Sequence, residues 1–126
     1  MSVVLDAGAL VALERGDRRL LAIVRDERAA GRIALTHGGI VGQVWRGGTG
    51  RQARLARALP GIGVRPIDDD LGRRAGVLLG QAGRSDVIDA ALVLIAEDGD
   101  EIFTADVADL RDLIAAAGKL VDLVEV

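Results

Sequence analysis

The 126-residue sequence contains no cysteine, one histidine and only two aromatic residues, Trp45 and Phe103. The lack of cysteine excludes disulfides and thiolate metal sites. A single histidine, His37, excludes zinc sites that are built from several imidazoles. Any metal site in this chain therefore depends on oxygen ligands, and oxygen ligands favour a hard cation such as Mg²⁺ or Mn²⁺.

Long hydrophobic runs are also missing. No stretch is long enough for a membrane-spanning helix, and the first residues, MSVVLDAGAL, lack the basic start and long apolar run of a secretion signal. We therefore expect a cytoplasmic protein with no membrane partner. Half of the residues are hydrophobic, which is enough for one core, so we expect residues 1–126 to form a single domain.

Acidic residues are absent from the middle of the chain. Residues 28–67 carry seven arginines and no acid, whereas residues 68–126 carry fourteen acids and five bases. This asymmetry predicts one surface that attracts anions and another that holds cations; the alternative is two ordinary solvated faces. Arg46, Arg51 and Arg54 cluster around a Gly-rich loop and are candidate phosphate contacts, again with a solvated face as the alternative.

Short apolar runs alternate with helical patterns along the whole chain. The runs predict strands at residues 2–5, 33–36, 62–67, 101–104 and 120–124. The periodic segments predict helices at residues 8–14, 17–30, 38–46, 51–59, 69–81, 87–96 and 106–118. This alternation is typical of an α/β protein, and we expect a three-layer α/β/α fold with a mostly parallel central sheet of four to five strands.

Three aspartates occupy unusual positions in this pattern. Asp6 ends the first predicted strand and Asp106 follows the fourth, at the sheet edge where ligands bind in open α/β folds. Asp89 lies in the first turn of the most apolar helix, where a charge is costly unless it is paired or bound to a metal. For any one acid alone, helix capping is the competing interpretation, and we assign Asp86 and Asp109 to capping or support. Three unpaired carboxylates at one edge would repel one another without a cation.

The segments VVLDAGALVAL, SDVIDAALVLIA and IFTADVADL, in this order and spacing, resemble the PIN domain, and most closely toxins of the VapC type. The resemblance covers essentially the whole chain. It implies a metal-dependent endoribonuclease in which Asp6, Asp89 and Asp106 bind Mg²⁺ or Mn²⁺ and Thr104 supports the site. It also implies an RNA substrate, a homodimer, and a cognate antitoxin that covers the acidic cleft.

The sequence departs from this family at one position. Such proteins usually carry a glutamate on the helix after the second strand, and the matching residue in IVGQVWRGG is Gln43. A glutamine keeps a carbonyl oxygen but has no charge, so metal affinity should fall, unless Glu14 or Asp86 compensates. The competing hypothesis is a catalytically weak or inactive module that acts through a protein partner. A response-regulator-like domain is a weaker alternative, because no Gly-rich phosphate loop follows the first strand.

Two isolated residues carry weaker predictions. His37 precedes a Gly-Gly pair, and we expect a structural or surface role for it rather than catalysis. For Trp45 we favour packing in the core or at a partner interface over stacking on a base.

Overall fold

Five short parallel strands form one sheet, in the order β3-β2-β1-β4-β5, in the computed structural model, which describes residues 1–126. The strands are β1 (Val3–Leu5), β2 (Leu35–His37), β3 (Gly63–Arg65), β4 (Glu101–Thr104) and β5 (Asp122–Glu125). The helices are α1 (Ala7–Glu14), α2 (Arg18–Ala29), α3 (Gly38–Val44), α4 (Ala53–Ala58), α5 (Asp69–Ala82), α6 (Val87–Ile95) and α7 (Val107–Ala117). The predicted α/β class is therefore confirmed, with a sheet that is wholly parallel.

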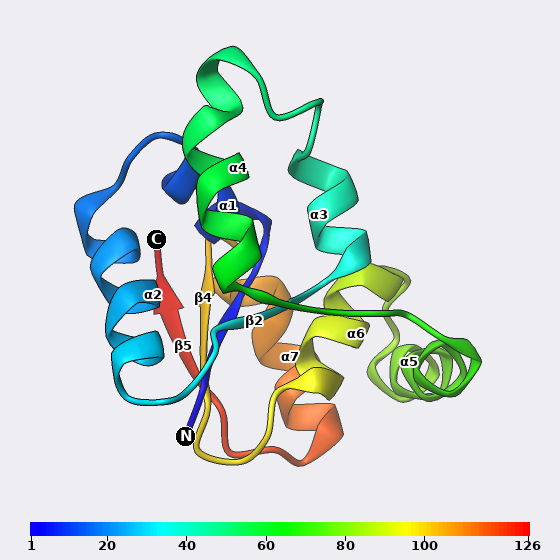
Figure 1. The fold of residues 1–126 in the computed structure, drawn as a ribbon. Helices are drawn as coiled ribbons and strands as arrows, with labels where there is room; N and C mark the ends of the chain where they lie inside the picture. Colours follow the sequence, from blue (N-terminus) through cyan, green and yellow to red (C-terminus); the bar gives the residue numbers. More distant parts are fainter.

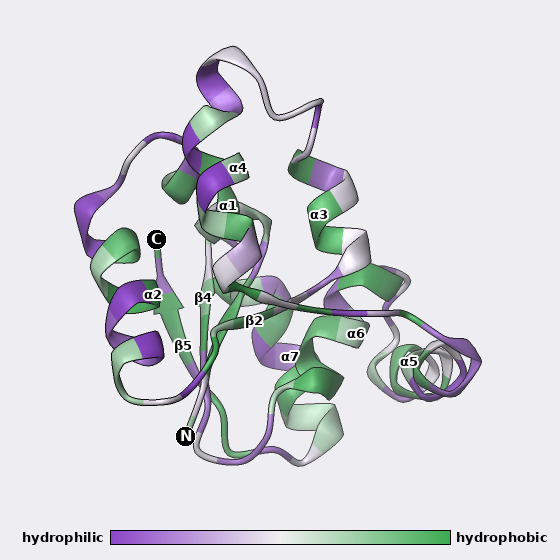
Figure 2. Cartoon of the chain, in the orientation of Figure 1, coloured by the Kyte–Doolittle hydropathy of each residue, from purple (hydrophilic) through white to green (hydrophobic).

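Helices cover both faces of this sheet and complete a three-layer α/β/α arrangement (Figure 1). Helices α5, α6 and α7 pack against one another, while α1 contacts α2, α3 and α4. Figure 2 shows the apolar side of α5 turned towards α6 and its hydrophilic side turned outwards. None of the helices combines the length and the apolar character needed to cross a membrane.

The core is aliphatic, with Phe103 as its one buried aromatic residue. It comprises 23 buried residues, and all three residues of β1 belong to it. Strand β1 lies at the centre of the sheet between β2 and β4, with helices on both faces. This burial on both faces explains why its sequence is a continuous apolar run without alternation.

Several element boundaries differ from the predicted ones. The second strand is Leu35–His37 instead of 33–36, and Ile33 is 55% exposed. The third strand shortens from 62–67 to Gly63–Arg65. The segment predicted as one helix over 51–59 is α4 flanked by two 3₁₀ turns. The α-helix ends before Pro60, which has no backbone N–H to continue it.

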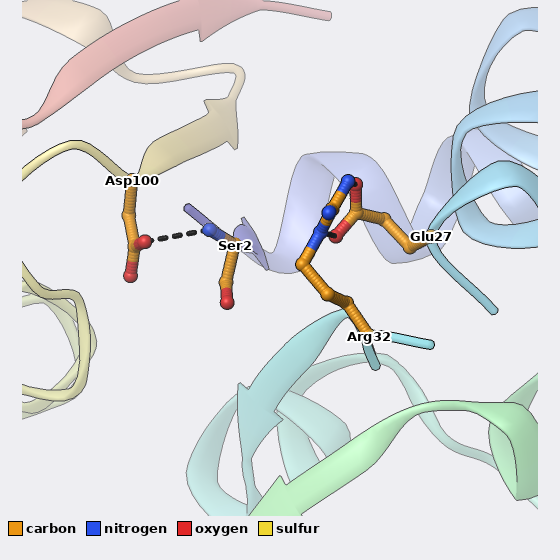
Figure 3. A network of polar contacts seen from close by, with 4 residues as sticks. All are labelled: Ser2, Glu27, Arg32 and Asp100. Carbon is orange, nitrogen blue, oxygen red and sulfur yellow. Dashed lines mark hydrogen bonds and ion pairs between the residues drawn. The ribbon is translucent and has the colours of Figure 1, made fainter. Parts of the chain in front are cut away.

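The amino-terminal edge of the sheet is held by structural contacts. Buried Asp100 accepts hydrogen bonds from the backbone N–H of Ser2 at 2.7 Å and of Glu97 at 2.9 Å. Arg32 donates two hydrogen bonds to Glu27, at 3.0 and 3.1 Å, in the second part of the same network (Figure 3). These contacts lie at the amino ends of the strands. The carboxyl ends form the opposite edge of the sheet, where ligands bind in such folds.

Candidate functional site

The sheet changes its winding direction at β1. Strands β2 and β3 extend the sheet on one side of β1, and β4 and β5 extend it on the other. At such a switch point the connections after the two neighbouring strands leave in opposite directions and open a crevice. Asp6 directly follows β1, and Asp106 follows β4 by one intervening residue. The backbone N–H of Asp6 also donates to Phe103 O at 3.1 Å, which fixes Asp6 beside β4.

Thr104 joins these two aspartates. Its hydroxyl donates to Asp6 Oδ2 and accepts a hydrogen bond from the backbone N–H of Asp106 at 2.8 Å. Asp6 Oδ1 accepts from the backbone N–H of Gly8 at 2.6 Å, so that Asp6 also caps α1. Asp6 and Thr104 are both buried, whereas Asp106 is exposed. The buried pair thus forms the fixed part of the site, with Asp106 at its solvent side.

Gly8 lets the start of α1 approach the loop after β4. A Cβ atom at position 8 would lie 2.7 Å from Ala105 Cβ, closer than two such atoms can pack. A residue with a side chain at this position would push the loop that carries Asp106 away from Asp6.

Asp89 enters from the first turn of α6. Asp86 caps this helix by accepting hydrogen bonds from the backbone N–H groups of Ile88 at 2.9 Å and Asp89 at 3.1 Å. The Asp89 carboxylate itself accepts no hydrogen bond from the protein, and no ion pair involves it. Its burial, followed by the charges of Asp86, Asp6, Asp106 and Asp109, raises the pKa of Asp89 to about 6.

The same cluster acts on Asp6. Burial raises the pKa of the Asp6 carboxyl, hydrogen bonds from Thr104 and Gly8 oppose this shift, and the charge of Asp106 adds to it. Asp6, Asp89 and Asp106 therefore lie within electrostatic reach of one another, although they are far apart in the sequence. No three Asp, Glu or His side chains are close enough to surround a single ion in the observed rotamers. The all-carboxylate donor set suits Mg²⁺ or Mn²⁺ in chemical type.

Arg84 is a cation beside this cluster. It is ion-paired with Asp112, and its Nη1 lies 3.6 Å from Asp109 Oδ1. It shares a pocket of about 120 Å³ with Asp86, Asp89 and Asp109, yet it forms no ion pair with Asp89. Asp109 is thus a supporting residue that holds Arg84, and the Asp89 charge is left without a direct partner.

Gln43 lies in a second pocket beside the acidic edge. This pocket, of about 510 Å³, lies between α1, α3 and the segment 46–52, and we call it the Gln43 pocket. Its polar lining residues are Glu14, Gln43, Arg46, Thr49, Arg51 and Gln52. The three aspartates do not line it, although Ala7, the residue after Asp6, does. The structure thus brings Gln43 together with Arg46 and Arg51, while the Arg54 guanidinium packs against the backbone of Gly16.

The two acids considered as substitutes for the missing glutamate are both engaged elsewhere. Asp86 caps α6, and Glu14 accepts a hydrogen bond from Gln52 Nε2 at 2.7 Å. Gln52 is a residue that sequence reasoning missed. It is 7% exposed; its Oε1 accepts from Arg46 N at 2.7 Å and Gly48 N at 3.3 Å, and its Nε2 also donates to Val44 O at 2.8 Å. Gln52 lies in an arginine-rich segment, and nothing in the neighbouring sequence predicts that it forms these hydrogen bonds.

His37 has a structural role, as expected. It is fully buried, and its Nδ1 accepts hydrogen bonds from the backbone N–H groups of Gly39 and Ile40 at the start of α3. Its Nε2 lies 2.8 Å from Ile88 O and donates to it in the neutral tautomer. Burial lowers the pKa of His37, and the Ile88 contact opposes this shift. His37 therefore ties α3 to the first turn of α6, beside Asp89.

No protein-family model matches the sequence, and no curated protein matches it either. The fold itself is the PIN-like three-layer α/β/α fold, with acidic residues at its switch point. A similar solved structure is that of VapBC2 from Rickettsia felis bound to a DNA fragment from their promoter, with a TM-score of 0.71. The match covers 100% of this chain and 99% of the other chain, at 11% sequence identity. The resemblance drawn from the three sequence motifs is thus confirmed at the level of the fold.

Proposed function

We propose that this protein is a metal-dependent endoribonuclease and the toxin component of a toxin–antitoxin pair. The observation that carries the proposal is that Asp6, Asp89 and Asp106 lie within electrostatic reach of one another near the switch point of the sheet, with the pKa values of Asp6 and Asp89 raised and no ion pair on Asp89. Such a cluster is costly for a protein unless a cation binds to it.

Asp6, Asp89 and Asp106 are the residues that would hold Mg²⁺ or Mn²⁺. The bound cation would polarise a phosphodiester and lower the pKa of an attacking water. Thr104 serves this chemistry by fixing one oxygen of Asp6 and the backbone of Asp106. It is a positioning residue, because both of its contacts are with the protein.

The position of His37 bears on the type of cleavage. Ribonucleases without a metal commonly rely on histidine for proton transfer. The one imidazole of this chain is buried, and both of its nitrogens contact backbone groups. We therefore propose hydrolysis by water, which needs no 2′-hydroxyl and leaves 5′-phosphate and 3′-hydroxyl ends.

A catalytically weak or inactive binding module is the second candidate. It is favoured by the neutral Gln43 and by the absence of a closed three-residue metal site in the observed rotamers. Substitution Gln43→Glu distinguishes the two candidates. It should raise cleavage if the site is active but short of one charge, and it should change nothing if the site has lost its activity.

The likeness to a chain of VapBC2, which was crystallised with promoter DNA, supports a further part of the proposal. We propose that a cognate antitoxin covers the acidic edge of this protein and that two copies of the chain form a homodimer. Single-stranded or looped RNA is the proposed substrate, because A-form duplexes hide their base edges.

The proposal is tested by incubating the purified protein with a pool of single-stranded RNAs in Mn²⁺ or in EDTA. Cleavage should require Mn²⁺, yield 5′-phosphate ends, and fall by at least about a hundredfold in both Asp6→Asn and Asp89→Asn. Asp26→Asn is a matched control, because Asp26 is exposed on α2 and remote from the acidic edge. Equal cleavage by the wild type and the two site variants, or cleavage that persists in EDTA, contradicts the proposal.

A further inference from the structure

We propose that the Gln43 pocket is a nucleotide subsite, which binds one nucleotide of a single-stranded RNA next to the bond held at the acidic edge. This inference rests on the proposed nuclease function and adds where the strand lies and which residues distinguish its bases. It assigns Gln43 a contact with the base of that nucleotide.

The location and size of the pocket fit this role. Its volume of about 510 Å³ is within the usual range of about 300–1,000 Å³ for small-molecule sites. Ala7 forms part of its wall, and the preceding residue is Asp6, whose carboxylate belongs to the acidic edge. A strand with one phosphate at Asp6 therefore has a neighbouring nucleotide at the mouth of this pocket.

The charge of the pocket favours a phosphate. Arg51 is exposed and forms no ion pair, so its guanidinium is free to bind an anion. Arg46 Nη1 donates to Gly42 O at 3.1 Å and to Trp45 O at 2.6 Å, which orients the guanidinium without neutralising it. Glu14 is the single acid in the lining, and its Oε1 is engaged by Gln52. Two unneutralised guanidinium groups at one pocket are a typical arrangement for backbone phosphates.

The remaining lining favours a base. The Gln43 amide is exposed, makes no hydrogen bond within the protein, and offers both a donor and an acceptor. Side-chain amides pair with base edges in this way. Val11 and Val44 supply apolar contact for the faces of a base. The pocket thus combines groups that bind a phosphate with groups that contact a base. A site for a simple anion would not need the second set of groups.

The pocket is also held open before any ligand binds. Gln52 joins the segment after α3 to α1 through its bonds to Arg46 N and Glu14. Gly48, at φ +75°, lies so close to the Trp45 ring that a Cβ atom there would clash with it. A preformed site binds without an ordering cost, so even a single nucleotide should bind measurably.

Binding of nucleoside 5′-monophosphates in EDTA tests the inference. The four monophosphates and inorganic phosphate are titrated into the wild type, with calorimetry and the fluorescence of Trp45, the one tryptophan, as readouts. We expect saturable binding whose dissociation constants differ by at least about fivefold among the four bases. Arg51→Ala should weaken binding by about tenfold, and Gln43→Ala should remove the difference among bases while binding persists.

Arg111→Ala is the matched control, because Arg111 is an exposed arginine on α7, which does not line the pocket. It should change each dissociation constant by less than about twofold. The inference is overturned by no binding in either readout at about 10 mM ligand, by equal effects of Arg51→Ala and Arg111→Ala, or by inorganic phosphate binding as well as all four nucleotides.

These outcomes are separable from the test of the nuclease itself. Binding is measured without a divalent cation, so it does not depend on cleavage. A protein that cleaves RNA but binds no nucleotide in this pocket contradicts only the subsite. A protein that binds nucleotides but cleaves nothing contradicts only the nuclease proposal.

Discussion

At the scale of single residues, the acidic edge is organised by a hydroxyl group. Thr104 contacts both Asp6 and the backbone of Asp106, and it is fully buried. Asp89 lacks such a donor, and it is the acid whose pKa rises to about 6. Burial raises the pKa of both carboxyls. At Asp6 the hydrogen bonds from Thr104 and Gly8 oppose this shift, whereas at Asp89 the charges of the neighbouring acids add to it.

This difference predicts a pH dependence of stability in the absence of metal. The pKa of Asp89 is about 6 in the folded protein against an ordinary value of 3.8, so the folded state binds the proton more tightly. The stabilising effect of protonation is complete below pH 3.8 and is lost as the pH rises through about 6. At pH 7 in EDTA, Asp89→Asn should therefore raise the free energy of unfolding by about 1–2 kcal/mol, after allowance for partial exposure.

Urea unfolding at pH 4, 5, 6 and 7 measures this effect, with Asp26→Asn as the control for loss of an exposed acid. The gain in Asp89→Asn should appear between pH 4 and 7 and grow with pH. A variant that is less stable than the wild type at pH 7 would mean that the Asp89 carboxylate has a protein partner that stabilises it.

The residues of the acidic edge could be named from the sequence because each one follows a recognisable strand or begins an apolar helix. The position of Gln43 could not. The resemblance in sequence motifs placed it at the position of a glutamate of the site, but only the packing of α3 on α1 shows that it lines a pocket with Arg46 and Arg51. The role of Gln52 was also hidden, since its four hydrogen bonds join three separate segments of the chain.

At the scale of elements, α6 is the helix that presents Asp89, and both of its ends are capped by side chains. Asp86 caps the start. At the other end, Lys119 Nζ donates to the carbonyl oxygens of Val93 at 3.1 Å, Leu94 at 3.0 Å and Ala96. A positive charge at the carbonyl end also interacts favourably with the helix dipole.

We predict that Lys119→Met, which keeps the aliphatic stem, lowers the free energy of unfolding by about 1–3 kcal/mol because three carbonyl groups lose their donor. Denaturation in urea measures this loss. Arg111→Met on α7 serves as the control, since no hydrogen bond or ion pair of its side chain is present, and it should change stability by less than about 0.5 kcal/mol. Equal losses in the two variants would show that the Lys119 contacts contribute nothing specific.

The existence of the helices and strands could be predicted from local sequence patterns, but the positions of their ends could not. All five strands and all seven helices were expected, because hydrophobic periodicity is a strong signal in a sheet that is buried on both faces. The end of β2 was misplaced for a specific reason. His37 caps α3 through its ring nitrogen, a role that Ser, Thr, Asp or Asn usually fills, so the strand continues to a residue that looks like part of a turn.

At the scale of the whole molecule, the charge asymmetry of the sequence becomes a spatial one. The acid-free segment 28–67 contains β2, α3, α4 and β3, and its two strands lie on the same side of β1. Helices α6 and α7, with most of the acids discussed above, follow in the other half of the chain. The Gln43 pocket is lined by residues 7–52, whereas the acidic edge joins Asp6 to Asp89 and Asp106 from later in the chain, and the two sites are adjacent at Asp6 and Ala7.

This arrangement predicts a salt dependence for RNA binding. If Arg46 and Arg51 each contact one phosphate, the logarithm of the binding constant for single-stranded RNA should fall with the logarithm of salt with a slope of about −1.4. Fluorescence anisotropy in EDTA between 50 and 200 mM salt, roughly the range over which such slopes are measured, gives the value. Arg51→Ala should make the slope shallower by about 0.7, whereas a slope near zero in the wild type would exclude phosphate contacts by this basic side.

The hydrogen bond between Asp6 and Thr104 has a consequence for the order of events during synthesis. The two residues are 98 positions apart, and β1 gains β4 as its neighbour only after β4 has been synthesised. Asp6 is therefore synthesised well before its partners Thr104 and Asp106. A nascent chain that has not yet reached β4 therefore carries no assembled acidic centre.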